Sequence, residues 1–185
     1  MILANYHCHS SFYDGIGEPA AYAEEAIRKG FASFGFTSHA PLPVPNNWTM
    51  KREDMAVYLE TIAALKEQYR GKLDIYRGLE VDFIPGVMGP HDETYRTLGL
   101  DYVIGSVHVI PDTETGEYRC VDYTTEEYEH LLSRVFENDI TAMVHDYFER
   151  VRRMIDAGGF RILAHIDLIR KKNRNNRYFS EEEEW

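Results

Sequence analysis

The chain has 185 residues, 44% of them hydrophobic and 13% aromatic, which is typical of a folded protein and not of a disordered one. Its 20 basic and 31 acidic residues give a formal net charge of −11. The resulting field repels polyanions, so duplex DNA and anionic membranes are not expected as main partners. The length predicts a single domain over residues 1–185.

The cysteine count and the N-terminal segment bear on the compartment. Two cysteines, Cys8 and Cys120, cannot form a disulfide framework, and the N-terminus lacks the basic and long apolar stretches of a signal peptide. No apolar run approaches the ~18 residues that a membrane span requires. We therefore expect a cytoplasmic protein.

Strands and helices are predicted to alternate along the first half of the chain. Residues 2–9 form a predicted buried strand, and Glu18-Pro19 begins a helix over 20–29 that Gly30 ends. The elements that follow are a strand over 31–37, a proline-rich loop over 40–47, a helix over 54–70 and a strand over 73–83.

The second half continues the alternation. Its predicted elements are a short helix over 92–98, a strand over 102–110, a turn-rich stretch over 111–118, a helix with one break over 124–157, a strand over 160–166 and the beginning of a helix over 180–185. This order predicts an α/β fold with parallel strands, in a barrel or a doubly wound sheet. A His or Glu at or near the C-terminal end of each strand favours the barrel, because barrel enzymes gather their functional residues there.

His7 and His9 close the first predicted strand. Residues i and i+2 of a strand point to the same side, so both imidazoles project together, while Cys8 points away and is expected to pack. Paired imidazoles suit Zn²⁺, Mn²⁺ or Fe²⁺. Because the chain has eight histidines, this pair alone is weak support for a metal site.

Four further residues strengthen the metal interpretation. Glu80 lies among apolar residues on a predicted buried strand, where an unpaired carboxylate is costly and a bound cation removes that cost. His39, His108 and His165 each lie at the end of an apolar strand. Each one alone is more often an ordinary core or surface histidine, but a barrel would bring all of these strand ends to one mouth.

The sequence does not assign a role to several other polar residues. The histidines outside the pattern are left unassigned: His91, His130 and His145. Three aspartates are as consistent with turn capping as with metal binding: Asp14, Asp82 and Asp167. The run over 170–177 is most often a solvated loop, but it is the one dense basic patch in an acidic chain, and Arg170 and Lys171 are candidates to hold a phosphate.

Five segments together resemble the PHP superfamily, the polymerase and histidinol phosphatase metal-dependent phosphoesterases, and most closely its histidinol-phosphatase branch. The segments are HCHS at 7–10, GFTSHAP at 35–41, GLEVD at 78–82, DYVIGSVH at 101–108 and LAHIDL at 163–168. They follow the family's order along the chain. The resemblance implies a distorted seven-stranded β/α barrel of PHP type that holds two to three divalent metals, Zn, Mn or Fe.

The resemblance also implies which residues bind each metal. The three implied groups are His7 with His9 and Glu80, then Glu80 as a bridge with His108 and His165, and finally His39 with Asp14. Catalysis would depend on Glu80, His7 and His9 through the bound metals. Ile166 stands where family members often carry proline, which leaves the ligand before it intact.

The family's late Asp-x-His motif is absent, and only about five β/α units are present. We therefore expect an incomplete, C-terminally truncated barrel, or one half of a pair. An incomplete barrel leaves an open sheet edge, which a second copy of the chain or another chain would have to cover.

The resemblance implies a phosphomonoesterase, with L-histidinol phosphate, an intermediate of histidine biosynthesis, as the leading substrate. The alternative within the family is another small phosphate ester or a nucleotide. The alternative of a different class is a metal-binding or partner-binding module without turnover.

Overall fold

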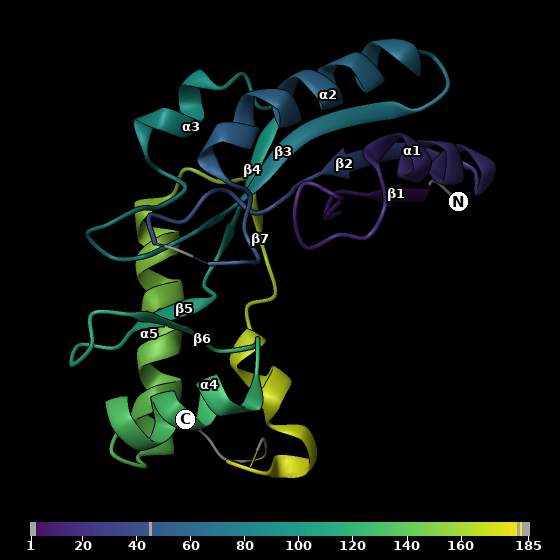
Figure 1. Ribbon diagram of the computed structural model, residues 1–185. Coiled ribbons are helices and arrows are strands. Elements are labelled where there is room, and N and C mark those ends of the chain that lie inside the picture. The colour runs from purple at the N-terminus through teal and green to yellow at the C-terminus, as the bar shows by residue number, and fades with distance from the viewer. Residues whose placement is uncertain (1–2, 45, 181, 183–185) are drawn as a thin grey trace. The chain divides into compact units, whose positions relative to one another are not determined.

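The computed structural model describes residues 3–44, 46–180 and 182, and it has an α/β fold (Figure 1). Five strands form one sheet in the order β1-β2-β3-β4-β7, and both the β1/β2 and β2/β3 pairs are parallel. The strands are β1 Leu3–Asn5, β2 Phe31–Phe36, β3 Asp74–Asp82, β4 Tyr102–Ser106 and β7 Ile162–Leu163. The predicted α/β class with about five strands is confirmed.

The helices lie where the sequence predicts them. They are α1 Pro19–Arg28, α2 Met55–Gln68, α3 Glu93–Thr97, α4 Thr125–His130 and α5 Ile140–Ala157. A π-helical turn, Leu131–Val135, continues α4, and the predicted break before α5 lies at residues 136–139, where Glu137 and Asn138 have positive φ. Within the described part of the chain, no helix has both the length and the apolar character needed to cross a bilayer.

The chain folds into two compact units, and each is described here by itself. Unit 1 comprises residues 1–81, 90–104 and 159–162. Unit 2 comprises residues 82–89, 105–158 and 163–185. The expectation of a single domain over 1–185 stays a prediction.

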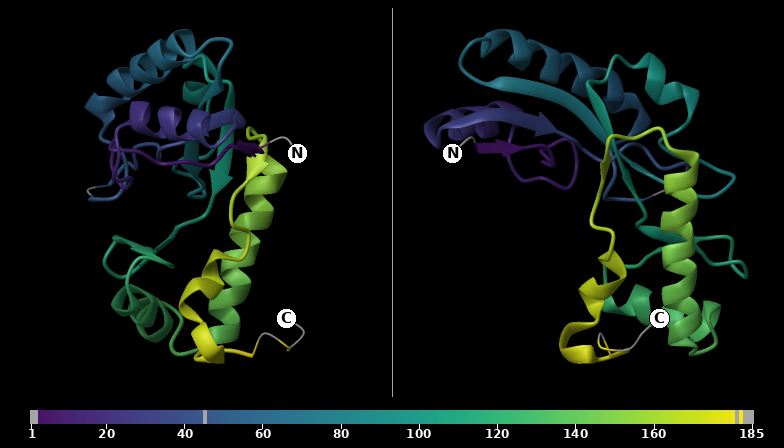
Figure 2. Two further views of the ribbon diagram at one scale, coloured as in Figure 1. Left: turned by 90° about the vertical axis from the view of Figure 1, so that its right-hand side faces the viewer. Right: turned by 180° about the vertical axis from the view of Figure 1, so that it is seen from behind.

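Unit 1 has its core between the sheet and two helices. Helix α1 packs on β2 and on α2 (Figure 2) and buries Ala23 and Ala26. Helix α2 buries Tyr58, Ile62 and Leu65, which share one face because they are spaced four and three residues apart. The Tyr58 hydroxyl donates a hydrogen bond of 2.7 Å to the Gly78 carbonyl and so ties this helix to β3.

Tyr102 of β4 ties together the strands of unit 1. Its hydroxyl donates a 2.6 Å hydrogen bond to the carbonyl of Tyr6, which directly precedes His7. A Cβ atom at Gly35 of β2 would lie 2.0 Å from this hydroxyl, and one at Gly78 of β3 would lie 2.8 Å from the ring carbon Cζ. The two glycines therefore make room for the ring of Tyr102 to reach the segment after β1.

Unit 2 contains a β-hairpin that the sequence did not reveal. The predicted strand over 102–110 is two strands, because β5 (Val109–Pro111) begins after β4 and pairs antiparallel with β6 (Tyr118–Cys120). The buried carboxylate of Asp112 accepts hydrogen bonds from Glu114 N and Thr115 N within the hairpin turn.

Two side chains attach this hairpin to α4. Asp112 Oδ2 lies 2.8 Å from His130 Nε2, which holds the turn of the hairpin against the end of the helix. The Glu127 carboxylate accepts a 2.8 Å hydrogen bond from Cys120 N. Thr124 caps α4 by accepting from Glu127 N, as its acidic first turn predicts.

Some predicted boundaries are wrong. Strand β1 ends at Asn5 and not at residue 9, although Cys8 stays hydrogen-bonded to the residue after β2, with Thr37 N donating to Cys8 O (2.8 Å). Strand β7 spans two residues instead of 160–166. The basic run forms two 3-10 turns, Leu168–Lys172 and Arg174–Asn176. Of the helix expected over 180–185, residues 181 and 183–185 lie outside the described residues.

The contact between Tyr102 and Gly35 predicts non-additive stabilities. Gly35→Ala should destabilise unit 1 by ~1–3 kcal/mol through overpacking, and Tyr102→Phe by ~1 kcal/mol through the lost hydrogen bond. In the double variant the hydroxyl closest to the new methyl group is gone, so the total should fall short of the sum by at least ~0.5 kcal/mol. Urea unfolding checks this.

Tyr69→Phe is the matched control, because the Tyr69 hydroxyl donates to Glu24 at 3.4 Å. Gly35→Ala and Tyr69→Phe should add within ~0.5 kcal/mol. Equal additivity of both pairs would contradict the role assigned to Tyr102.

Candidate metal centre

The segment after β2 places His39 beside Glu80. Glu80 N donates to Ser38 O (3.2 Å) and Ala40 N donates to Glu80 O (2.8 Å), which forms an isolated parallel bridge between His39 and Glu80. Glu80 is 1% exposed, and it lies among the apolar neighbours that the sequence indicated. Pairing beyond the end of the strand therefore fixes the spacing of these two candidates.

One oxygen of Glu80 collects the imidazoles of unit 1. Glu80 Oε2 lies 2.7 Å from His7 Nε2, 2.9 Å from His9 Nε2 and 3.6 Å from His39 Nδ1. The two Nε2 atoms of His7 and His9 are 3.2 Å apart. Two nitrogens of a tetrahedral zinc site, each at ~2.05 Å from the ion, are separated by about 3.3 Å. The pair thus has the spacing of two ligands of one ion.

Asp14 orients His9 from the opposite side. Asp14 Oδ2 lies 2.7 Å from His9 Nδ1 and 3.5 Å from His39 Nε2. An ionised carboxylate can only accept, so Nδ1 of His9 donates to Asp14, and Nε2, which faces Glu80, is the nitrogen that could bind a metal ion in place of a second proton. A carboxylate behind a histidine is the arrangement that orients many metal ligands.

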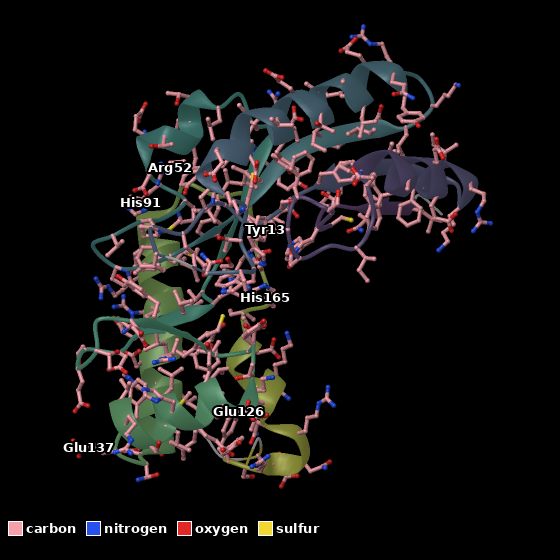
Figure 3. The ribbon with its side chains drawn as sticks, viewed as in Figure 1. Tyr13, Arg52, His91, Glu126, Glu137 and His165 are labelled. Carbon is pink, nitrogen blue, oxygen red and sulfur yellow. The ribbon has the colours of Figure 1, made fainter. Side chains whose placement is uncertain are left out.

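The loop that carries Asp14 has a constrained backbone. Tyr13, labelled in Figure 3, has a φ of 146°, a region that side-chain-bearing residues rarely adopt. A Cβ atom at Gly15 would lie 2.4 Å from Ser10 N, so only glycine fits there. The close return of the chain to Ser10 places Asp14 next to the histidines.

The charges of this group reinforce one another. Burial alone would lower the pKa of His9, but the hydrogen bonds and charges of Asp14 and Glu80 outweigh it and raise this pKa to about 9. Burial alone would raise the pKa of Asp14, but its hydrogen bond to His9 and the charges of His9 and His39 lower it. The group therefore favours positive charge between its carboxylates.

A cation would supply the same charge. One ligand atom each from His9, His39 and Glu80 lie within 4.8 Å of one another, a spacing at which the three residues could hold a metal ion. Cys8 is poorly suited to join them, because burial raises the pKa of its thiol to about 11 and so disfavours the thiolate.

Trp48 is a neighbour of this group that the sequence did not single out. Its ring packs edge-on against His39, with 5.0 Å between ring centroids. The amide oxygen of Asn46 accepts from Trp48 N (3.1 Å) and Thr49 N (2.8 Å), which fixes the turn that carries the indole. Trp48 directly follows the proline-rich loop that the sequence predicts over 40–47.

Unit 2 holds the other two candidate imidazoles. His108 follows β4, and His165 follows β7 (Figure 3); their ring centroids are 4.8 Å apart. Asp82 is buried and accepts from His108 N at 2.7 Å, and Asp82 Oδ1 lies 3.1 Å from His108 Nδ1. Asp82 therefore holds the proton on Nδ1, so Nε2 of His108 is the nitrogen that could bind a metal ion.

Asp122 is a second residue that the sequence did not reveal. Its side chain is 14% exposed, and its Oδ2 lies 2.7 Å from Lys171 Nζ. Burial alone would raise the pKa of Asp122, but the charges of His108, Lys171 and His165 outweigh it and lower this pKa. Asp122 is thus a carboxylate whose charged form is stabilised by Lys171 and by the two candidate imidazoles of unit 2.

The remaining polar residues lie elsewhere. His130 pairs with Asp112 and so attaches the β5–β6 hairpin to α4. His91 and His145 are exposed, His91 within 3.7 Å of Asp92. Asp167 accepts a 3.2 Å hydrogen bond from Arg170 on the surface.

Solved structures share this fold. The putative histidinol phosphatase of Listeria monocytogenes superposes with a TM-score of 0.75 at 23% identity, over 93% of this chain and 70% of that one. The histidinol phosphate phosphatase of Lactococcus lactis, complexed with Zn, L-histidinol and phosphate, superposes with a TM-score of 0.65 at 21% identity, over 90% and 58%.

Sequence relatives point to the same group of proteins. The chain is 31% identical over 172 residues to the probable histidinol-phosphatase of Deinococcus radiodurans, covering 91% of this chain and 62% of the relative. It is 34% identical over 163 residues to the histidinol-phosphatase of Bacillus subtilis, covering 81% and 59%. The chain thus spans about three fifths of the length of these relatives. The PHP domain model matches residues 5–185, and the chain belongs to the PHP domain family.

Proposed function

We propose that this chain is part of a metal-dependent phosphomonoesterase whose leading substrate is L-histidinol phosphate. The observation that carries the proposal is the buried Glu80 carboxylate, whose single oxygen meets His7, His9 and His39 within a PHP domain. The names of the relatives at 31% and 34% identity support the substrate. Burying the Glu80 carboxylate without a positive partner would cost free energy, and a bound cation would offset this cost, which supports the metal.

We further propose that unit 1 binds divalent metal through His7, His9, His39 and Glu80, with Asp14 orienting His9. His108 and His165 are the proposed ligands of unit 2. The zinc in the Lactococcus structure supports Zn as one of two to three metals, with Mn and Fe as alternatives. The expectation that Glu80 also serves His108 and His165 concerns residues of separate units and stays a prediction.

Each protein group has a defined part in this chemistry. Bound divalent metals would supply positive charge that holds the phosphate and lowers the pKa of a bound water. His7 and His9 present their Nε2 atoms toward Glu80. Asp14 and Asp82 keep the protons of His9 and His108 on Nδ1, so that the opposite nitrogens stay available as ligands.

Two other functions are open to the same residues. A different small ester or a nucleotide would use the same metals, and a phosphate-release screen over sugar, amino-alcohol and nucleotide monoesters separates these substrates. A non-catalytic metal-binding module would bind metal and hydrolyse no ester in that screen. The proposed cytoplasmic location is supported by the free thiols of Cys8 and Cys120, and the oligomeric state stays open.

Metal should stabilise the protein through the histidines of unit 1. Zn²⁺ at 100 times its dissociation constant should add ~2.7 kcal/mol to the free energy of unfolding. His39→Ala should lose most of this gain relative to the chelator-treated protein, whereas His91→Ala, an exposed histidine outside the group, should keep it. Thermal unfolding with Zn²⁺ and with EDTA measures both. Equal gains in the two variants would refute the assignment of His39.

Asp82 should tune the metal that His108 binds. His108→Ala should remove one Zn²⁺ site. Asp82→Asn should lower the Zn²⁺ affinity of that same site by ~10- to 100-fold, the usual effect of losing the hydrogen-bond partner of a metal ligand. Asp112→Asn is the control, because it alters another buried Asp–His pair of unit 2. Chelator competition gives the affinities, and an equal loss in both variants would contradict the role of Asp82.

Glu80→Gln should abolish turnover and metal occupancy together. The amide keeps the shape of the side chain but loses the charge that the three imidazoles share, so kcat/KM for L-histidinol phosphate should fall by more than ~100-fold. Glu60→Gln on the exposed side of α2 should leave both unchanged. An active Glu80→Gln variant with full metal content would dispose of the proposal.

A further inference from the structure

Thr37 holds the residue that lies between the two paired histidines of unit 1. Its backbone N–H donates to the Cys8 carbonyl (2.8 Å), and its Oγ1 accepts from the Cys8 N–H (3.1 Å). Both backbone groups of Cys8 are therefore bound by one residue. We propose that Thr37 is a positioning residue of the metal centre, which sets where His7 and His9 lie relative to the other ligands, an inference that rests on the proposed function.

The contact keeps the register of two neighbouring strands beyond their ends. Asn5 pairs with Phe34, and β1 ends at Asn5. Cys8 and Thr37 lie equally far along the chain from these two residues, so they meet where a continued ladder would place them. In a parallel ladder the Cys8 N–H would donate to a backbone carbonyl, whereas here it donates to the Thr37 hydroxyl. A side chain thus keeps the register of a segment that has left the sheet.

The Thr37 side chain is fixed in the orientation that this contact needs. Thr37 is 0% exposed. Its methyl carbon Cγ2 packs against β3, because a Cβ atom at Gly78 would lie 2.9 Å from it. A β-branched side chain is stiff at χ1, so the placement of the methyl group at Gly78 directs the hydroxyl to Cys8. Loss of the hydroxyl would leave the Cys8 N–H without this acceptor.

Two further side chains hold the same segment. The Tyr102 hydroxyl donates to the Tyr6 carbonyl (2.6 Å), and Asn5 Oδ1 accepts from the His7 N–H (3.0 Å). Three consecutive residues of this segment therefore have a backbone group bound by a side chain. Thr37 differs from the other two partners because it binds through its backbone as well as through its side chain.

Thr37 also links the two segments that carry the histidines of unit 1. It precedes His39 by two residues, and the carbonyl of Ser38 between them accepts from Glu80 N (3.2 Å). The ring centroids of His9 and His39 are 4.4 Å apart. A shift at Thr37 would therefore change the distance between ligand atoms of the two segments. Metal affinity depends on such distances and on the groups that orient the ligands.

Two pairs of variants isolate the hydroxyl. Thr37→Val keeps the shape of the native side chain without the hydroxyl, and Thr37→Ala differs from Thr37→Ser by the hydroxyl alone. In each pair the protein without the hydroxyl should bind Zn²⁺ about tenfold more weakly, the lower end of the effect of losing a group that orients a ligand. Chelator competition in a His108→Ala background measures this without the proposed zinc of unit 2. Thr37→Ala and Thr37→Ser add no bulk beside Cys8, so they carry the test if Thr37→Val does not fold.

A general loss of stability would give a different pattern. Thr37→Ser loses the methyl group that packs at Gly78, so it should unfold at a lower urea concentration than the native protein, yet its Zn²⁺ affinity should stay within about threefold. Ile62→Val is the matched control, because it removes one buried carbon from another element of unit 1. It should lower stability and change Zn²⁺ affinity less than about twofold.

Binding and turnover together separate this inference from the proposed function. Equal Zn²⁺ affinities within both pairs would overturn the role of Thr37 and leave the phosphatase standing. A tenfold loss in the proteins without the hydroxyl, in a chain that hydrolyses no phosphomonoester, would keep the role of Thr37 and overturn the phosphatase. Failure of the native chain to bind Zn²⁺ would overturn both.

Discussion

The burial of one carboxylate governs the arrangement of unit 1. Glu80 lies in the apolar end of β3, where an isolated negative charge would cost several kcal/mol. The structure offsets that cost with nitrogens from two segments that are far from Glu80 in sequence, one carrying His7 and His9 and the other carrying His39. Every strand that delivers one of these groups must therefore end at the correct depth, and the parallel order β1-β2-β3 provides this.

The same device recurs in unit 2 with the roles exchanged. There the deeply buried carboxylate of Asp82 contacts Nδ1 of His108. Asp122, which is paired with Lys171, is the more exposed carboxylate of this group. In both units a carboxylate engages Nδ1 of a histidine, and this leaves Nε2 as the nitrogen that could bind a metal ion. The pattern explains why an acidic chain can present basic ligand atoms.

The larger helices and strands and the histidines at the strand ends could be predicted from the sequence. Helices α1 and α2 and strand β3 were predictable because they have clear periodicity and end signals. The ends of β1 and β7 were not, since short edge strands are set by their partners and not by their own residues. Asp122 and Trp48 escaped notice because a lone carboxylate or indole in a turn has no sequence signal; only the fold brings each beside a histidine.

The ring of Tyr102 has a consequence for how this sequence can change over time. Its room is provided by missing side chains at Gly35 and Gly78, each just upstream of a residue of the Glu80 group. A mutation at either glycine meets the ring, whereas a smaller residue at 102 would leave a void and release the Tyr6 carbonyl. The three positions are therefore expected to covary as a unit, and drift at one of them is tolerated only after compensation at another.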